Sequence, residues 1–268
     1  MVFLLLVAIV FNYWLLAGLF FLITLFGLWE FYSIFTTEAV HPQRLFGTIG
    51  GILLYMTSIV VFRVDIPDLP VNPSFIPILL AIPLFFLPFV FEIYRRKPQP
   101  LVNVAITITG ILYIALPLAL LNMMNGEEVV RFWKLPVVLT GFFILTWIYD
   151  TGAYLFGKRF GKHELFKRIS PKKTWEGTIA GAVLTLLASV GLYFLAPDIS
   201  LPDWIIFSIL IILFGSFGDL AESLFKRSFN IKDSGSILPG HGGILDRFDS
   251  IFISVPFVFL YLVLRNLI

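Results

Sequence analysis

The sequence predicts an all-α protein, a polytopic bundle of about nine transmembrane helices. Its 268 residues are 59% hydrophobic and only 13% charged, which leaves too little polar surface to cover a water-soluble globule. Runs of about twenty apolar residues recur along the chain, and alternating strand patterns are absent, so helices are favoured over a membrane barrel. The chain has no Cys, which excludes disulfides and thiol chemistry.

The apolar runs and their polar breaks give eight clear spans, and the N-terminal region adds one more. The eight are predicted at 14–34, 46–62, 74–91, 101–121, 136–156, 176–196, 204–222 and 250–267. Residues 2–35 as one helix would measure roughly 51 Å against a hydrocarbon core of about 30 Å. A break near Asn12 therefore gives a short first helix over 2–10, which we expect to be retained because its flanks do not resemble those of a signal peptide.

The middle of the chain contains several prolines and a polar linker. Pro77, Pro83 and Pro88 predict a kinked or broken helix at 74–91. The short polar linker 122–134 then divides the chain. We expect residues 1–122 to be an N-terminal packing region and residues 123–268 to be the catalytic region.

The distribution of basic residues predicts the orientation in the membrane. With the short first helix counted as span 1, the loops after spans 2, 4, 6 and 8 carry fifteen Lys and Arg, and those after spans 3, 5 and 7 carry three. The positive-inside rule then places the basic loops, including 157–175 and 223–249, in the cytoplasm. We expect a multi-pass protein of the cell membrane whose active site faces the cytoplasm and whose C-terminus lies outside.

Three acidic residues fall inside predicted spans, near their cytoplasmic ends. Asp150 lies in the sixth span, and Asp219 and Glu222 lie in the eighth, on a helix face shared with Lys226. Charge at this depth is costly and usually functional. The alternative is that each carboxylate only pairs with a Lys or Arg of a loop.

A second acidic pair, Asp246 and Asp249, is spaced three residues apart where the last helix begins. A hard divalent ion such as Mg²⁺, bridging Asp219 and Asp246, would neutralise these acids while holding phosphate oxygens. The alternative is that Asp246 and Asp249 only favour a helix N-terminus through the helix dipole.

Glycines surround the histidine of the same loop. Gly240, Gly242 and Gly243 flank His241 and leave backbone N–H groups free to approach an anion at a helix start. The loop therefore predicts a phosphate-binding segment.

The loop 157–175 is the second basic element. Ser170 followed by Pro171 predicts a helix cap and first turn, which would fix Lys172 and Lys173 at the cytoplasmic face. Cations there suit a triphosphate or an anionic lipid head group. The alternative is a solvated basic loop that only sets topology, with Trp175 as an interfacial anchor.

The pattern as a whole resembles one known family. The run Ser223-x-x-Lys226-Arg227-x4-Lys232-Asp233-x-Gly235-x-x-Leu238-Pro239-x-His241-Gly-Gly-x-x-Asp246-Arg247-x-Asp249 matches, without a gap, the signature of the phosphatidate cytidylyltransferase (CDP-diacylglycerol synthase) family. The segments that begin at Asp150 and at Ser170 resemble upstream blocks of that family. The likeness is strong over about 135–265, and the N-terminal half is similar only in layout.

The resemblance implies an enzyme that joins CTP to phosphatidic acid within the lipid membrane, giving CDP-diacylglycerol and pyrophosphate. It implies Mg²⁺, with a second cation left open, a homodimer, and no nucleic acid as partner. Its implied metal ligands are Asp219, Asp246 and Asp150. Its catalytic residues are Lys226, Arg227, His241, Arg247 and Asp249, and its substrate-binding residues are Lys172, Lys173, Ser223, Lys232, Asp233, Gly240, Gly242 and Gly243.

Two other functions remain open from the residues alone. One is a CTP-dependent polyprenol or lipid kinase, which would also combine many spans with a cytoplasmic basic site. The other is an ion-coupled transporter, in which the acids in the spans relay ions. The long charged loop argues against the transporter, because relay acids sit near the membrane midplane.

Overall fold

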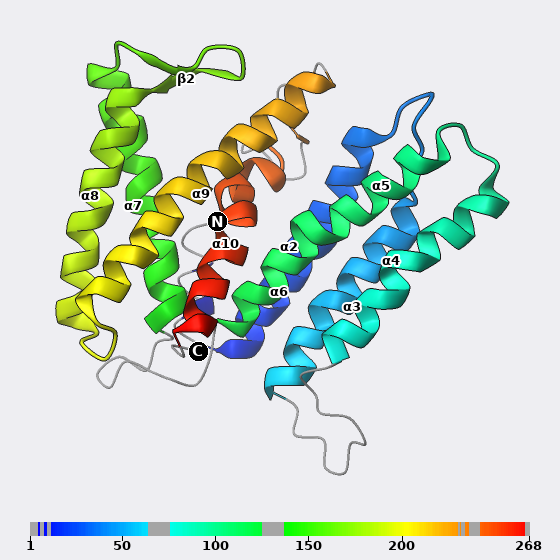
Figure 1. The fold of residues 1–268 in the computed structure, drawn as a ribbon, viewed down its shortest axis with the longest axis horizontal. Coiled ribbons are helices and arrows are strands. Elements are labelled where there is room, and N and C mark those ends of the chain that lie inside the picture. Colours follow the sequence, from blue (N-terminus) through cyan, green and yellow to red (C-terminus); the bar gives the residue numbers. More distant parts are fainter. Residues whose placement is uncertain are drawn as a thin grey trace. The chain divides into compact units, whose positions relative to one another are not determined.

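The computed structural model describes residues 5, 8–9, 12–63, 76–124, 137–229, 231, 234–235 and 242–265. Eight helical segments account for most of them (Figure 1). They are α2 (Tyr13–Phe35), α3 (Arg44–Arg63), α4 (Ile76–Arg95), the continuous run α5 (Pro100–Gly110), η2 (Ile111–Ala115, a π-helical turn) and α6 (Leu116–Met123), then α7 (Val137–Phe160), α8 (Trp175–Leu195), α9 (Leu201–Ser228) and α10 (Leu245–Leu264). Two short strands, β1 (Glu164–Phe166) and β2 (Ser170–Thr174), interrupt the otherwise all-helical fold.

Each of the eight clear spans coincides with one of these helical segments, but the prediction of about nine spans is wrong for the described chain. Six described helices are long and apolar enough to cross a membrane: α2, the run Pro100–Met123, α7, α8, α9 and α10. Helix α3 offers only the shorter apolar stretch Arg44–Val60. The additional span at 2–10 falls mostly outside the described residues.

The described chain divides into two compact units, residues Met1–Met123 with Ile231–Arg247, and residues Met124–Asn230 with Phe248–Ile268. In the first unit, α3 packs against α2, α4, η2 and α6. Tyr32 of α2 lies fully buried in this unit and donates its hydroxyl to the carbonyl of Thr107, at 2.7 Å. Gly47 and Gly110 face the Tyr32 ring, and a side chain at either position would overlap it.

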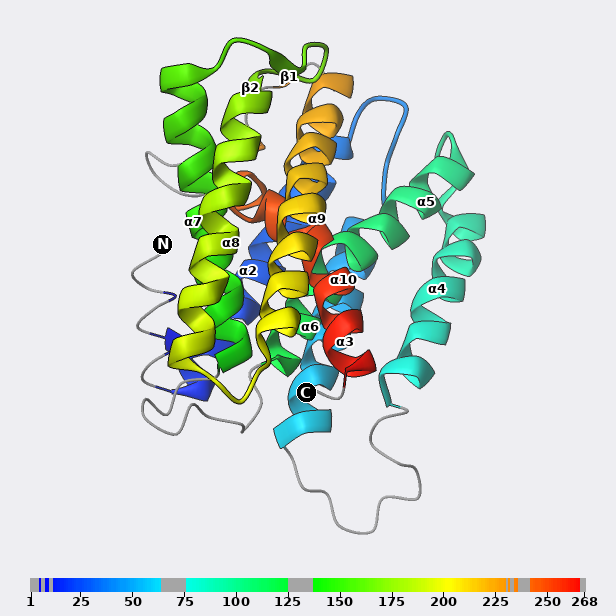
Figure 2. The ribbon, with the colours of Figure 1, turned by 60° about the vertical axis from the view of Figure 1, so that its left-hand side comes forward.

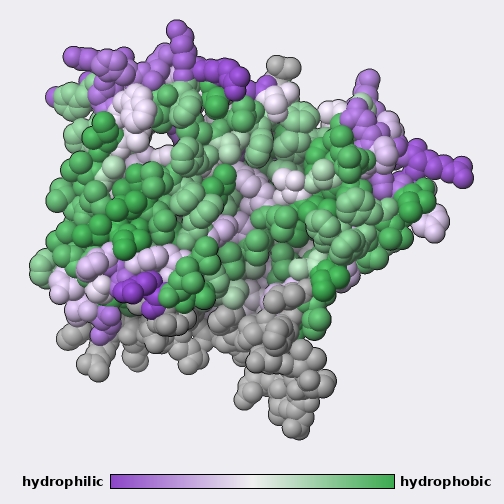
Figure 3. Space-filling model, viewed as in Figure 1, coloured by the Kyte–Doolittle hydropathy of each residue, from purple (hydrophilic) through white to green (hydrophobic). Residues whose placement is uncertain are grey.

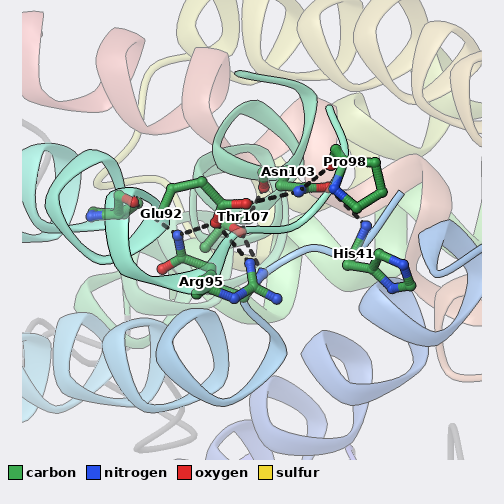
Figure 4. A network of polar contacts seen from close by, with 8 residues as sticks. His41, Glu92, Arg95, Pro98, Asn103 and Thr107 are labelled. Atoms are coloured by element: carbon green, nitrogen blue, oxygen red, sulfur yellow. Dashed lines mark hydrogen bonds and ion pairs between the residues drawn. The ribbon is translucent and has the colours of Figure 1, made fainter. Parts of the chain in front are cut away.

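A buried polar network ties together the helix ends of the first unit (Figure 4). The Glu92 carboxylate of α4 accepts hydrogen bonds from Gln43 at 2.8 Å, Asn103 at 2.7 Å and Arg95 at 2.7 Å. Asn103 in turn accepts from the backbone N–H of His41, at 2.7 Å. Because every bond involves a desolvated carboxylate or amide, the network fixes the connection between α2 and α3 against α4 and α5.

Helix α4 is continuous, so the expected break does not occur. Pro83 and Pro88 both lie inside it. The carbonyl of Pro88 accepts a hydrogen bond from the Gln43 side chain at 2.7 Å, so a side chain from outside the helix satisfies one of its backbone groups.

In the second unit, α7, α8 and α9 lie side by side, with the β1–β2 hairpin at one end (Figure 2). Glycines bring α7 and α8 into close backbone contact. A Cβ on Gly177 would lie 2.5 Å from the carbonyl oxygen of Ala153, and one on Gly181 would lie 2.9 Å from that of Tyr149. Small residues at a helix interface permit this approach in membrane proteins, where packing rather than hydrophobicity drives association.

The expected helix cap at Ser170 and Pro171 is wrong. Residues Ser170–Thr174 form β2, which pairs antiparallel with β1, and Thr174 is the cap of α8 instead. Its side-chain oxygen accepts the backbone N–H of Gly177 at 3.2 Å, and Glu176 follows in the first turn. Strand pairing of Phe166 with Ser170 holds Ser170 outside the helix.

Helix α10 packs against α9 in the same unit. The rings of Phe214 and Phe257 stack with centroids 3.5 Å apart. At the start of α9, the buried Asp203 carboxylate accepts hydrogen bonds from Ser200, Tyr261 and Arg265. This clasp fixes the C-terminal end of α10 to the N-terminal end of α9.

The outer surface of the second unit is typical of a membrane protein. Over α7, α8 and α9 it is hydrophobic between a hydrophilic cap at the hairpin and a smaller hydrophilic patch at the opposite end (Figure 3). Only 17% of the apolar stretch of helix α8 is buried inside the protein. Such a band matches the hydrocarbon region of a bilayer.

Candidate active site

One cavity of about 620 Å³ opens in the second unit beside the hairpin, and it collects polar side chains from five elements. Helix α7, strand β2 and helices α8, α9 and α10 all contribute to its wall. Its lining residues are Tyr149, Asp150, Ala153, Tyr154, Gly157, Lys158, Leu165, Ser170, Lys172, Lys173, Thr174, Thr178, Gly215, Ser216, Asp219 and Asp249. A cavity with a few convergent charged groups is the default location of a binding site.

Three carboxylates from three different helices line this cavity. Asp150 comes from α7, Asp219 from α9 and Asp249 from α10. Their negative charges act on one another. Within the described part of the chain, no three His, Asp or Glu side chains lie close enough together to enclose a metal ion.

Lysines balance these acids from the hairpin side. The Lys173 ammonium forms an ion pair with the Asp219 carboxylate, and both side chains remain partly exposed, at 27% and 33%. Lys158 and Lys172 line the same cavity. Hence the loop 157–175 brings two of its predicted residues, Lys172 and Lys173, to the acids of α7, α9 and α10.

The close approach of α9 and α10 places Asp219 and Asp249 on the same cavity. A Cβ on Gly218 would lie 2.4 Å from the carbonyl oxygen of Asp249, so only glycine allows this contact without a shift of the backbone. The glycine preceding Asp219 therefore has a packing role that the sequence reading did not consider.

Glu222 lies one turn further along α9, buried, and forms an ion pair with Lys226 at 2.6 Å. This is the simple pairing that the sequence left open as an alternative for Glu222. The negative charge of Glu222 also acts on Asp249. Ser223 is partly exposed on the same helix, and Arg227 is exposed in its last turn.

The remaining predicted residues belong to the segment that ends in the first turn of α10, and the described ones lie in the first unit. Asp246 lies in the first turn of α10, and its Oδ2 atom accepts backbone N–H groups of Ser234 and Gly243, both at 3.1 Å. Gly242 has a positive φ of 82°, which explains the glycine there. Arg247 is exposed. The predicted residues Lys232, Asp233, Gly240 and His241 lie outside the described residues.

The structure thus brings Asp150, Asp219, Asp249, Lys172 and Lys173 to one cavity. Since Asp246 belongs to the other unit, its sharing of a metal ion with Asp219 stays a prediction.

Comparison with known proteins identifies the family to which the chain belongs. The model of the cytidylyltransferase family matches residues 1–265, nearly the whole chain. The chain belongs to the cytidylyltransferase family. It is therefore a multi-pass membrane protein of a family of nucleotidyltransferases, and the resemblance seen in the sequence is confirmed.

Curated relatives in this cytidylyltransferase family share about half of their residues with the chain over the aligned part. A phosphatidate cytidylyltransferase of Staphylococcus aureus (strain COL) is 52% identical over 124 residues, which is 45% of this chain and 47% of the relative. Phosphatidate cytidylyltransferases of Staphylococcus haemolyticus (strain JCSC1435) and Staphylococcus epidermidis (strain ATCC 35984) are 50% and 46% identical over 123 residues. The alignments span about half the length of these relatives.

Several residues of this candidate site were missed in the sequence. Tyr149 and Ser216 face the cavity and form a hydrogen bond with each other. Lys158 was counted only as part of a basic loop. The helical spacing of Ser216 three residues before Asp219 was a usable signal.

Proposed function

We propose that the protein transfers the cytidylyl group of CTP to phosphatidic acid, giving CDP-diacylglycerol and pyrophosphate. The observation that carries this proposal is the cavity in which three carboxylates and three lysines meet at one end of apolar helices, in a member of the cytidylyltransferase family. A lipid substrate and a nucleotide meet most simply at such a place, at head-group depth. The names of the relatives point to the same reaction.

The reaction needs charge compensation more than proton transfer. An oxygen of the lipid phosphate attacks the α-phosphorus of CTP, the bond from that phosphorus to the β-phosphate oxygen breaks, and pyrophosphate leaves. The lipid phosphate is already anionic at neutral pH, so no general base is required. The main barrier is the repulsion between two polyanions, and positioning and electrostatic stabilisation reduce it.

The lysines of the cavity are suited to reducing the repulsion between the two anionic substrates. Lys173 and Lys172 come from β2, and Lys158 comes from the last turn of α7. We propose that Lys172 and Lys173 bind phosphates of the substrates. Substrate phosphate would compete with Asp219 for the Lys173 ammonium, so binding would release the Asp219 carboxylate for another cation. Lys226, Arg227, Arg247, Lys232, His241 and the loop glycines are proposed to contribute further phosphate contacts.

The acids of the cavity offer the oxygen donors that Mg²⁺ prefers. This ion is usually held by one or two carboxylates together with substrate phosphates and water, so a closed cage of three carboxylates is not needed. We propose Asp219 as one ligand, with Asp150, Asp246 and Asp249 supplying further donors. When bound, Mg²⁺ would neutralise phosphate charge and polarise the reacting phosphoryl group. A second cation is left open.

The proposed arrangement places CTP entry on the cytoplasmic side and lateral entry of phosphatidic acid from the bilayer. Residues 1–122 would serve as a packing region and residues 123–268 as the catalytic region. We also propose that the protein functions as a homodimer in the cell membrane, with its C-terminus outside.

The position of the label in CTP tests the proposed reaction. Purified protein in phosphatidic acid micelles, given CTP labelled on the α-phosphate, should transfer label into lipid and release unlabelled pyrophosphate. Transfer of label into a lipid alcohol from γ-labelled CTP alone would contradict the proposal and would instead identify a lipid kinase. The absence of transfer from either label would contradict both enzymes.

A further inference from the structure

Glu30 of α2 is a buried carboxylate that no step of the proposed reaction uses. It is 3% exposed, and it binds the segment before α10 more than 200 residues away in the sequence. Its Oε2 atom accepts the backbone N–H of Ile244 at 2.9 Å, and its Oε1 atom accepts the backbone N–H of Leu245 at 3.2 Å. Ser234 donates its hydroxyl to Oε1.

Two glycines of the signature segment, the family signature over 223–249, are packed against this carboxylate. A Cβ on Gly243 would overlap Glu30 and Ser234, and a Cβ on Gly235 would lie 3.0 Å from the Glu30 carboxyl carbon. The sequence suggested that Gly243 allows the backbone to approach a phosphate. In the structure, the anion that Gly243 approaches is Glu30.

Asp246 binds the same segment. Its Oδ2 atom accepts the backbone N–H groups of Ser234 and Gly243, so Ser234 is bound by both carboxylates. Ser234 therefore links Glu30, which accepts its hydroxyl, to Asp246, which accepts its backbone N–H. Removal of Glu30 would leave two buried N–H groups and one hydroxyl without an acceptor, and the segment would have to move to satisfy them.

We propose that Glu30 is a positioning residue for the active site, which fixes the start of α10 and thereby the carboxylate of Asp246. This inference rests on the proposed function, because it gives Asp246 its role as a metal ligand. Outer residues that orient metal ligands typically change metal affinity or activity by about 10- to 100-fold when they are replaced. Glu30 does not touch the reacting atoms, so its loss should affect turnover and metal dependence more than CTP binding.

The test compares Glu30→Gln with Glu92→Gln. Glu92 is a matched control, because it is also a buried carboxylate of the first unit with several hydrogen bonds, and none of its described partners lies in the signature segment. The measurements are kcat, the KM for CTP, the half-saturating Mg²⁺ concentration, and the Tm. We expect both variants to lower the Tm, but only Glu30→Gln to lower kcat by about tenfold or more and to raise the Mg²⁺ requirement.

Ser234→Ala supports the same test should Glu30→Gln fail to fold, since it removes one donor to Glu30 without adding bulk. We expect it to lower kcat and to raise the Mg²⁺ requirement in the same direction, by less than Glu30→Gln. A kcat and a half-saturating Mg²⁺ concentration within about twofold of those of Glu92→Gln, in whichever variant folds, would overturn the inference. If the parent protein itself transferred no label from α-labelled CTP into lipid, this would instead contradict the proposed function.

Discussion

At the scale of single residues, Lys173 connects the hairpin to the acidic helices. It comes from a strand of five residues and pairs with Asp219 of α9. A charge-assisted contact of this kind contributes about 1.5–3 kcal/mol, which corresponds to about a 10- to 100-fold change in rate if a substrate phosphate takes the place of Asp219.

We therefore expect Lys173→Ala to lower kcat/KM for CTP by about 10- to 100-fold. The control is Lys167→Ala, which removes a cation of the same hairpin that does not line the cavity. Steady-state kinetics with α-labelled CTP checks both variants. Activity of Lys173→Ala equal to that of Lys167→Ala would reduce the loop to a role in topology.

A second single residue, Asp203, is expected to matter for stability alone. It is buried, whereas its partner Arg265 is 56% exposed, at the end of α10. Because Asp203→Ala removes hydrogen bonds from Ser200, Tyr261 and Arg265, we expect a loss of at least about 2 kcal/mol in the free energy of unfolding. Denaturation of the purified protein in detergent measures it, and the exposed Asp198→Ala is the control. Equal stability of the two variants would show that the clasp is not stabilising.

At the scale of helices, the contact between α7 and α8 positions the hairpin and the part of the cavity wall that these two helices form. Both helices approach through glycine, and Gly177 faces the backbone of Ala153 and Gly157. Backbone atoms cannot rotate away as side chains do, so an added methyl group must separate the helices.

Gly177→Ala should accordingly destabilise the protein by about 1–3 kcal/mol and lower activity by moving Lys172 and Lys173. Gly191→Ala on the same helix is the matched control, because a Cβ there meets nothing within 4 Å. This control should be neutral or slightly stabilising, since alanine favours a helix by up to about 1 kcal/mol over glycine. A Tm of Gly177→Ala as high as that of Gly191→Ala would contradict the close contact.

The sequence allowed accurate prediction of the helices and less accurate prediction of their connections. Hydrocarbon thickness sets the length of an apolar run, so each of the eight clear spans corresponds to a helical segment. The hairpin was missed because Ser170 and Pro171 are good helix-start residues locally, and a strand partner outside that segment decides their conformation. Helix α4 continues through Pro83 and Pro88, and the carbonyl of Pro88 is bound by Gln43, which lies far away in the sequence.

For the site, the residue types could be predicted, but not their partners. Charge is rare in these spans, so Asp150 and Asp219 were conspicuous, and both line the cavity. Glu30 carried the same signal of an acid in an apolar run. Its partners are two backbone N–H groups and the Ser234 hydroxyl, all more than 200 residues away, and no spacing rule could have identified them.

At the scale of the whole molecule, the orientation in the membrane is a separate prediction. The chain has no Cys, so any cysteine introduced is the only one. We expect Lys167→Cys in the hairpin to react with an impermeant maleimide only from the cytoplasmic side, and Asp198→Cys between α8 and α9 only from outside. Intact cells and inverted vesicles separate the two outcomes, and the reverse labelling pattern would contradict the proposed cytoplasmic site.

The Mg²⁺ dependence of label transfer from α-labelled CTP into lipid tests the central proposal most directly. It is measured in the parent, in Asp219→Asn, in Asp246→Asn and in the exposed control Asp198→Asn. If Asp219 and Asp246 hold the ion, the first two variants should lose activity by about 100-fold or require far more Mg²⁺, while the control matches the parent. Parental activity and unchanged Mg²⁺ dependence in Asp219→Asn would contradict a metal-assisted cytidylyl transfer at this cavity.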